Sequence, residues 1–203
     1  MTPTSAVLPG VGACLTALRA GTREHHAQIE QILEMDRLSE PKHHRRVMQA
    51  MLDFHAAWEV PMLSAHGRDD RIFLTAGSRW AMLVDDAREL KLRVPEPAGH
   101  GSCREWLSRA DQAWGSAYVV WGSMLGGQVI CKQMAPQRDG PVGDVAGWRY
   151  FKGHGPLTGP LWKEFLKRLD ERSQAEGFCV EACVQAAQRT FDHMGQCFRR
   201  LPA

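Results

Sequence analysis

The sequence has almost no excess of charge of either sign. Its 25 Lys and Arg residues nearly balance its 23 Asp and Glu residues, which gives a formal net charge of +2. It contains no block of basic residues and no acidic tail. Binding to large charged partners usually depends on such clusters. We therefore expect neither nucleic acid nor membrane as a partner.

Several motifs of catalytic and metal sites are also missing. The chain has no GxSxG sequence, no phosphate-binding loop and no GxGxxG sequence, so hydrolase, kinase and Rossmann functions are not indicated. It lacks HExxH and the two ExxH repeats of di-iron carboxylate bundles. Its histidines form no set with metal-ligand spacing. A metal held by protein side chains alone is therefore not expected.

No pair of cysteines has CxxC spacing. The six cysteines are scattered, and most lie in segments with helical periodicity. This distribution favours reduced thiols over a disulfide framework, and it predicts a cytoplasmic protein. Cys179 and Cys183 are four residues apart and could meet a metal, but buried structural thiols explain them better.

Strand signals are almost absent, and helical periodicity covers most of the chain. We predict an all-α protein with one domain, residues 13–203, after a flexible N-terminus, residues 1–12. About seven or eight helices are expected. They include 15–35 with a break at Gly21-Thr22, 42–58 with a bend or end near Pro61, 79–92, 114–132, 160–174 and 179–201. Segments 66–77, 94–103 and 137–158 are expected to be turns or loops.

The predicted helix 114–132 combines apolar character with glycine. Its first eighteen residues carry no formal charge. Gly115, Gly122, Gly126 and Gly127 lie inside it, although each costs about 1 kcal/mol relative to alanine in a helix. At about 100° per residue, the first three fall within about 40° of one another. One face of this helix therefore lacks side chains.

Two interpretations of this face remain open. A neighbouring helix could pack tightly on the small residues, or a flat ligand could lie on the helix backbone. Gly122, Ser123, Gly126 and Gly127 would let the helix bend over such a ligand, because helices kink at Gly and Ser pairs. Spacing alone does not decide between the two.

The first helix carries a ridge of polar side chains: Arg19, Arg23, His26 and Glu30. An iron-bound imidazole usually has its other nitrogen held by an acceptor, and Glu30 could serve directly or through water. An ordinary salt-bridge ladder on an exposed helix edge would give the same pattern. His25 lies about as close to the apolar stripe as His26 does. Periodicity does not choose between the two imidazoles.

Three separated blocks of the sequence resemble the heme oxygenases, particularly the short bacterial type encoded beside bacteriophytochromes. LRAGTREHHAQIE, residues 18–30, is similar to the family's proximal helix, and GSMLGGQVI, residues 122–130, is similar to its distal helix. RYFKGHGPLTGPLWKEFLKRL, which begins at Arg149, resembles the C-terminal part of the bacterial members, together with the helix around Phe191. The first two blocks together are far more specific than either alone.

The resemblance implies a heme oxygenase-like helical bundle that holds heme between the proximal and distal helices. In the family's proximal pattern, a Thr is followed four residues later by the iron-ligating His and, four further on, by a Glu. Thr22, His26 and Glu30 match these positions, so the resemblance makes His26, rather than the preceding histidine, the axial ligand of the iron. Arg19 and Arg23 would pair with the heme propionates.

On the distal side, the resemblance implies that the backbone at Gly122, Gly126 and Gly127 lies over the heme. A Cβ at these positions would push on bound O₂ or on the macrocycle. Many members have an Asp directly after the first glycine of this motif, where the present chain has Ser123. A hydroxyl can hold a water but lacks the charge of a carboxylate.

The implied reaction opens heme to biliverdin and releases CO and ferrous iron. Heme b would be both cofactor and substrate, O₂ would be consumed, and a ferredoxin or another reductase would donate electrons. A bacteriophytochrome is the implied acceptor of the bilin. Ser123 motivates an alternative, a heme-binding sensor or carrier that does not degrade heme. A helical interaction module without heme is a third class.

Overall fold

The computed structural model describes residues 12–97, 102–134 and 147–201. Every regular element in these residues is helical, which confirms the predicted all-α class. The α-helices are α1 (Ala13–Leu33), α2 (Pro41–Ser64), α3 (Arg68–Ala76), α4 (Trp80–Glu89), α5 (Ala110–Met134), α6 (Arg149–Lys152), α7 (Thr158–Ser173) and α8 (Val180–Arg200). Six of these helices have ten residues or more, which is fewer than the seven or eight predicted. The described residues contain eight α-helices only when the short α3 and α6 are counted.

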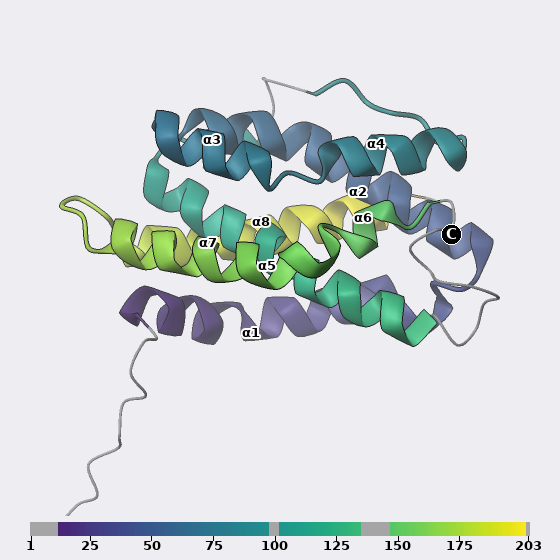
Figure 1. Cartoon of the computed structure of the whole chain (residues 1–203), viewed down its shortest axis with the longest axis horizontal. Coiled ribbons are helices and arrows are strands. Elements are labelled where there is room, and N and C mark those ends of the chain that lie inside the picture. The colour runs from purple at the N-terminus through teal and green to yellow at the C-terminus, as the bar shows by residue number, and fades with distance from the viewer. Residues whose placement is uncertain (1–11, 98–101, 135–146, 202–203) are drawn as a thin grey trace, which may run out of the picture.

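The helices are arranged around α8. In Figure 1, α3 and α4 lie along the upper edge and α1 along the lower edge, with α5, α7 and α8 between them. α8 packs closely against α5, α1 and α2. By contrast, α1 and α5 both pack on α8 but have few direct contacts with each other. This arrangement leaves room for a cavity between α1 and α5.

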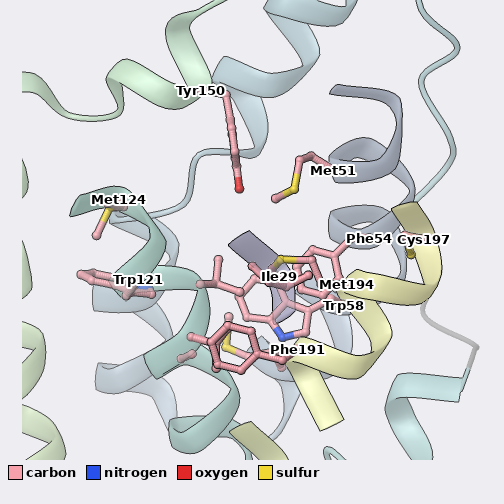
Figure 2. Close-up of a cluster of buried hydrophobic side chains, with 14 of the residues drawn as sticks. Ile29, Met51, Phe54, Trp58, Trp121, Met124, Tyr150, Phe191, Met194 and Cys197 are labelled. Atoms are coloured by element: carbon pink, nitrogen blue, oxygen red, sulfur yellow. The ribbon is translucent and has the colours of Figure 1, made fainter. Parts of the chain in front are cut away.

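Large apolar side chains fill the interior where α2, α5 and α8 meet. Figure 2 shows part of this core, including Trp58, Trp121 and Phe191. A buried chain of hydrogen bonds crosses the same helices. Trp58 Nε1 donates to Ser116 Oγ over 2.7 Å, and Ser116 Oγ lies 2.6 Å from Thr190 Oγ1. Because buried polar groups are costly when unpaired, this chain favours one register of the three helices.

Most helix limits follow local sequence signals. α2 begins at Pro41, one residue before the predicted start, because the N–H that proline lacks is not needed in the first turn. It continues through Pro61 to Ser64. Gly177, between α7 and α8, has a φ of +81°, a conformation that favours glycine.

The predicted break in the first helix is wrong. α1 runs through Gly21 and Thr22 without interruption. The side chain of Thr22 is buried, and its hydroxyl donates to the Leu18 carbonyl one turn earlier over 2.7 Å. Threonine inside a helix commonly makes this bond, which here replaces the expected capping role.

The prediction of a turn at residues 66–77 is also wrong, because this segment contains α3. The helix starts after Gly67 and carries Asp69 and Asp70 in its first turn. Acidic side chains stabilise this end of a helix through its dipole. Asp70 also accepts a hydrogen bond from Arg172 of α7 over 3.0 Å, which ties the short helix to the bundle.

The predicted loops are described only in part. Residues 135–146 and 98–101 lie outside the described residues, as do residues 1–11 of the predicted flexible N-terminus. The described part of the predicted loop 137–158 is not a plain loop, because it contains α6 and a 3₁₀ turn at Gly155–Leu157. Within the described ranges, no helix is long and apolar enough to cross a membrane.

Candidate functional site

A cavity of about 410 Å³ lies between α1 and α5, and side chains from α2, α6 and α8 complete its walls. Most of its surface is apolar, with Ile29, Met51, Val119, Phe191 and Met194 among the lining residues. Figure 2 shows several of these side chains converging on the same space. Apolar walls with a few polar groups are typical of sites for apolar ligands and cofactors.

His26 and His25 lie in different surroundings. His26 is at the exposed edge of the cavity, and its Nδ1 lies 3.5 Å from Oε1 of Glu30. This contact leaves Nε2 as the nitrogen that can bind a ligand. His25 instead faces α8, with Nε2 3.9 Å from Oδ1 of Asp192. The structure thus brings the predicted pair, His26 and Glu30, to the cavity.

Two glycines of α5 face open space at the cavity wall. A Cβ at Gly126 would meet no atom within 4 Å. A Cβ at Gly122 would meet only the Trp162 ring, at an ordinary contact distance of 3.6 Å. Packing between protein groups therefore gives no reason for glycine at these two positions.

The other two glycines of the predicted set are packing positions. A Cβ at Gly115 would overlap the carbonyl oxygen of Cys183 in α8. A Cβ at Gly127 would lie 2.5 Å from the carbonyl oxygen of Phe151 in α6. Gly127 also lines the cavity, but the close approach of α6 already accounts for glycine there, and its role as a ligand contact stays a prediction.

Ser123 and Arg79 form a polar corner of the cavity. The Ser123 hydroxyl donates to the Val120 carbonyl over 2.8 Å and accepts a hydrogen bond from Arg79 over 2.6 Å. Arg79 is only 3% exposed, and it also donates to the carbonyls of Val120 and Tyr150. Burial lowers the pKa of Arg79, yet arginine keeps its charge in proteins. A fixed positive charge therefore borders the cavity.

Tyr150 of α6 brings a hydroxyl to the same cavity. In Figure 2, this hydroxyl points toward the space between Met51 and Ile29, which also line the cavity. It lies 2.9 Å from Nε2 of His55 in α2. Burial raises the pKa of Tyr150 and lowers the pKa of His55, so both side chains are neutral near pH 7.

The polar chain continues from His55 to Glu59. Nδ1 of His55 lies 3.7 Å from Oε2 of Glu59, one turn later in α2. A second cavity of about 10 Å³, about enough for one water, borders both residues. The Glu59 side chain is 15% exposed, against 1% for His55, and it accepts a hydrogen bond from the Ser78 hydroxyl. Polar groups thus lead from near the surface to Tyr150.

Asp86 of α4 holds the start of α6 and therefore Tyr150. Its carboxylate is fully buried and accepts hydrogen bonds from the backbone N–H groups of Arg149 and Tyr150, over 3.1 and 2.8 Å. The Arg149 guanidinium also reaches Asp86, over 3.3 Å, and Glu89, over 2.6 Å. The first N–H groups of a helix have no partner inside it, so a carboxylate there fixes its position.

Arg19 and Arg23 do not line this cavity. Both are exposed on α1, and Arg19 borders a separate surface hollow together with Lys163 and Lys167 of α7. Arg19 also lies beside Tyr118, which does line the cavity, and the role of both arginines as propionate partners stays a prediction.

The donor groups do not suit a bare metal ion. Among the described residues, no three His, Cys, Asp or Glu side chains form a group that could hold one, and the six cysteines are free thiols. A metal beside His26 would have to bring most of its own ligands, as porphyrin iron does. The sequence matches no protein-family model and no curated protein. A functional assignment therefore depends on the geometry of the cavity and on the three resembling blocks.

Three residues of the site were not singled out in the sequence. Arg79 is the first residue of a predicted helix, Tyr150 lies in a predicted loop, and His55 is an isolated histidine on an amphipathic helix. Their contacts join positions 71 and 95 residues apart. No local pattern marks such contacts, so the fold was needed to find them.

Proposed function

We propose that this protein is a heme oxygenase, which opens heme to biliverdin and releases CO and ferrous iron. The observation that carries the proposal is the placement of His26 and the glycine backbone of α5 on one apolar cavity. These are the residues that the resemblance assigns to the two faces of the heme. They come from helices about a hundred residues apart in the sequence, so neither motif alone requires this arrangement.

The residues around the cavity fit heme. The apolar walls suit a porphyrin, and a Cβ at Gly126 would project into open space that a flat ligand can use. His26 offers one imidazole, which is the protein ligand that heme iron takes when the porphyrin fills its other in-plane positions. When bound, heme would supply the iron at which O₂ is bound and reduced.

On the α1 side, His26 would bind through Nε2 while Glu30 holds Nδ1. A carboxylate on the second nitrogen fixes the orientation of an imidazole and raises its basicity as a ligand. The distance of 3.5 Å between Nδ1 and Oε1 allows a direct contact after a small rotation, or one bridging water.

On the α5 side, the bare backbone at Gly122 and Gly126 would leave room above the macrocycle. The charge of Arg79 favours negative charge on oxygen as it is reduced, because a preorganised cation in a dry site needs little reorganisation. Ser123 supports Arg79 in this proposal. Its own hydroxyl donates to the Val120 carbonyl and also contacts the Tyr150 side chain.

The remaining parts of the proposal concern partners. Electrons would come from a separate ferredoxin or other reductase, in the cytoplasm, and a bacteriophytochrome would accept the bilin. Arg19 and Arg23 would pair with the heme propionates from exposed positions on α1, where Arg19 lies beside the cavity-lining Tyr118.

One observation favours a second candidate, a heme-binding sensor or carrier that leaves heme intact. The distal carboxylate that many heme oxygenases use is replaced by Ser123, whose hydroxyl is held between Val120 and Arg79. If no other group donated a proton in the cavity, bound O₂ would not be activated.

The test is a heme titration of the purified protein, followed by ascorbate under air. A Soret band that is replaced by a broad red bilin band is the expected result. A Soret band that persists would favour the sensor or carrier. Absence of any Soret band would exclude both heme functions and leave the helical interaction module.

Two variants then test the ligand. We expect His26→Ala to abolish the spectrum of the axially ligated heme, and His25→Ala to leave it nearly unchanged. The reverse result would assign the iron to the histidine that faces Asp192.

A further inference from the structure

Three polar side chains lead from Glu59 of α2 to the cavity between α1 and α5. Tyr150 faces the cavity, its hydroxyl lies 2.9 Å from Nε2 of His55, and Nδ1 of His55 lies 3.7 Å from Oε2 of Glu59. The cavity of about 10 Å³ beside His55 and Glu59 is about large enough for one bridging water. The chain begins at the partly exposed Glu59 and ends at a neutral phenol.

The second nitrogen of His55 decides what the buried Tyr150–His55 pair can do. A buried tyrosine and a buried histidine often satisfy each other's hydrogen bonds, and the second histidine nitrogen commonly bonds to a backbone carbonyl or a carboxylate. In His55 this nitrogen faces the titratable carboxylate of Glu59, and the small cavity borders both residues. Every group in the chain can both accept and donate a proton.

We propose that Glu59, His55 and Tyr150 form a proton relay and that Tyr150 donates the proton inside the cavity. The inference depends on the proposed function, because reduction of O₂ in the cavity consumes protons. It also supplies the donor that Ser123, with its proton directed to a backbone carbonyl, does not provide.

The relay conserves protons at each step. The Tyr150 O–H bond breaks as its proton passes to oxygen being reduced in the cavity, and Tyr150 takes a proton from Nε2 of His55. His55 takes a proton at Nδ1 from Glu59, directly or through water, and Glu59 takes one from solvent. No electron moves along this chain. His55 changes from the Nε2–H to the Nδ1–H tautomer and returns after each transfer.

Arg79 assists this role of Tyr150. Its guanidinium carbon lies 4.2 Å from the centroid of the Tyr150 ring, and its positive charge is buried there. Such a charge stabilises the negative charge that the phenol oxygen carries while its proton leaves. Arg79 is a positioning and charge-stabilising residue in this scheme, and Tyr150 is the residue that meets the reacting oxygen.

The first test needs no heme. NMR of the protein with ¹⁵N-labelled histidine should show His55 as the neutral Nε2–H tautomer near pH 7, and Tyr150→Phe should shift its ring nitrogen signals. Tyr118→Phe, the chain's other tyrosine position, should leave them unchanged. An imidazolium, a fixed Nδ1–H tautomer or signals that ignore Tyr150→Phe would each overturn the relay.

The second test uses the heme-loaded protein. Tyr150→Phe should slow bilin formation by about 100-fold, within the usual range for a lost general acid, while heme affinity stays similar. His55→Gln should slow it by about 10-fold, because glutamine keeps a hydrogen bond to Tyr150 but cannot change tautomer. Glu59→Gln, at a partly exposed position, should act in the same direction.

Coupling between the variants separates a relay from general damage. The double variant Tyr150→Phe/His55→Gln should be no slower than Tyr150→Phe alone, because both changes interrupt one chain. Multiplied effects would overturn the proposal. His66→Gln is the matched control, since His66 is a buried histidine outside the cavity. An equal loss of bilin formation in His66→Gln would also overturn the proposal.

Failure of heme to bind would disprove the heme function, and the NMR test would still decide the relay.

Discussion

Gly115 and Gly126 lie on one predicted face of α5, yet their surroundings are opposite. At Gly115, α8 approaches so closely that a methyl group would overlap its backbone. At Gly126, a methyl group would meet no atom within 4 Å. Each of the two interpretations of the glycine face therefore applies to a different part of α5. Tight helix packing explains Gly115, and room for a ligand is the remaining explanation for Gly126.

The difference arises because the neighbour of α5 changes along its length. The part around Gly115 packs on α8, whereas the part around Gly126 faces the cavity shared with α1. Glycine in a helix is costly wherever it occurs. At Gly115, close packing against α8 requires glycine and so accounts for its cost. At Gly126, no packing contact in the folded protein accounts for that cost.

The largest change in stability is expected for Gly115→Ala. The added methyl group would force α5 and α8 apart, because the backbone carbonyl of Cys183 cannot rotate away. We expect a loss of about 3 kcal/mol in the free energy of unfolding. The corresponding fall in Tm, about 6–12 °C, can be measured by circular dichroism. Gly159→Ala, where a Cβ meets nothing within 4 Å, is the control, and an unchanged Tm for Gly115→Ala would contradict the close packing.

A smaller effect, on ligand binding rather than folding, is expected for Gly126→Leu. The leucine side chain would occupy part of the cavity of about 410 Å³. Heme affinity should fall about 30-fold, equivalent to about 2 kcal/mol, in a Soret titration. Gly159→Leu, on α7 and outside the cavity lining, should leave the affinity unchanged. Equal heme affinity in Gly126→Leu would place the ligand elsewhere.

The smallest effect is expected for Gly126→Ala, and it has the opposite sign to that of Gly115→Ala. Alanine removes the helix cost of glycine without meeting another atom, so the protein should gain about 1 kcal/mol in stability. Urea unfolding measures this gain. A loss of stability would mean that the backbone at this position needs the conformational freedom of glycine.

The sequence predicts the helical class and most long helices because their apolar periodicity persists over several turns. It does not predict α3, a helix of nine residues with a charged first turn. The continuity of α1 through Gly21 and Thr22 also escapes prediction, because threonine can either cap a helix or bond back to the preceding turn.

Part of the candidate site could be predicted and part could not. His26, Glu30 and the glycines lie within two short segments, so their spacing identifies them, although only the resemblance chooses His26 over His25. Arg79 and Tyr150 meet α5 through contacts between distant segments. Arg19 and Arg23 share the helix ridge of His26 and Glu30, but only the latter two line the cavity.

The carboxylate of Asp86 has one more consequence. It accepts two backbone N–H groups at the start of α6, from a position 64 residues earlier in the sequence than Tyr150. Of the three residues in these bonds, only Tyr150 lines the cavity. The tyrosine is therefore preorganised: the entropy of ordering it is lost when the chain folds, and little more should be lost when a ligand binds.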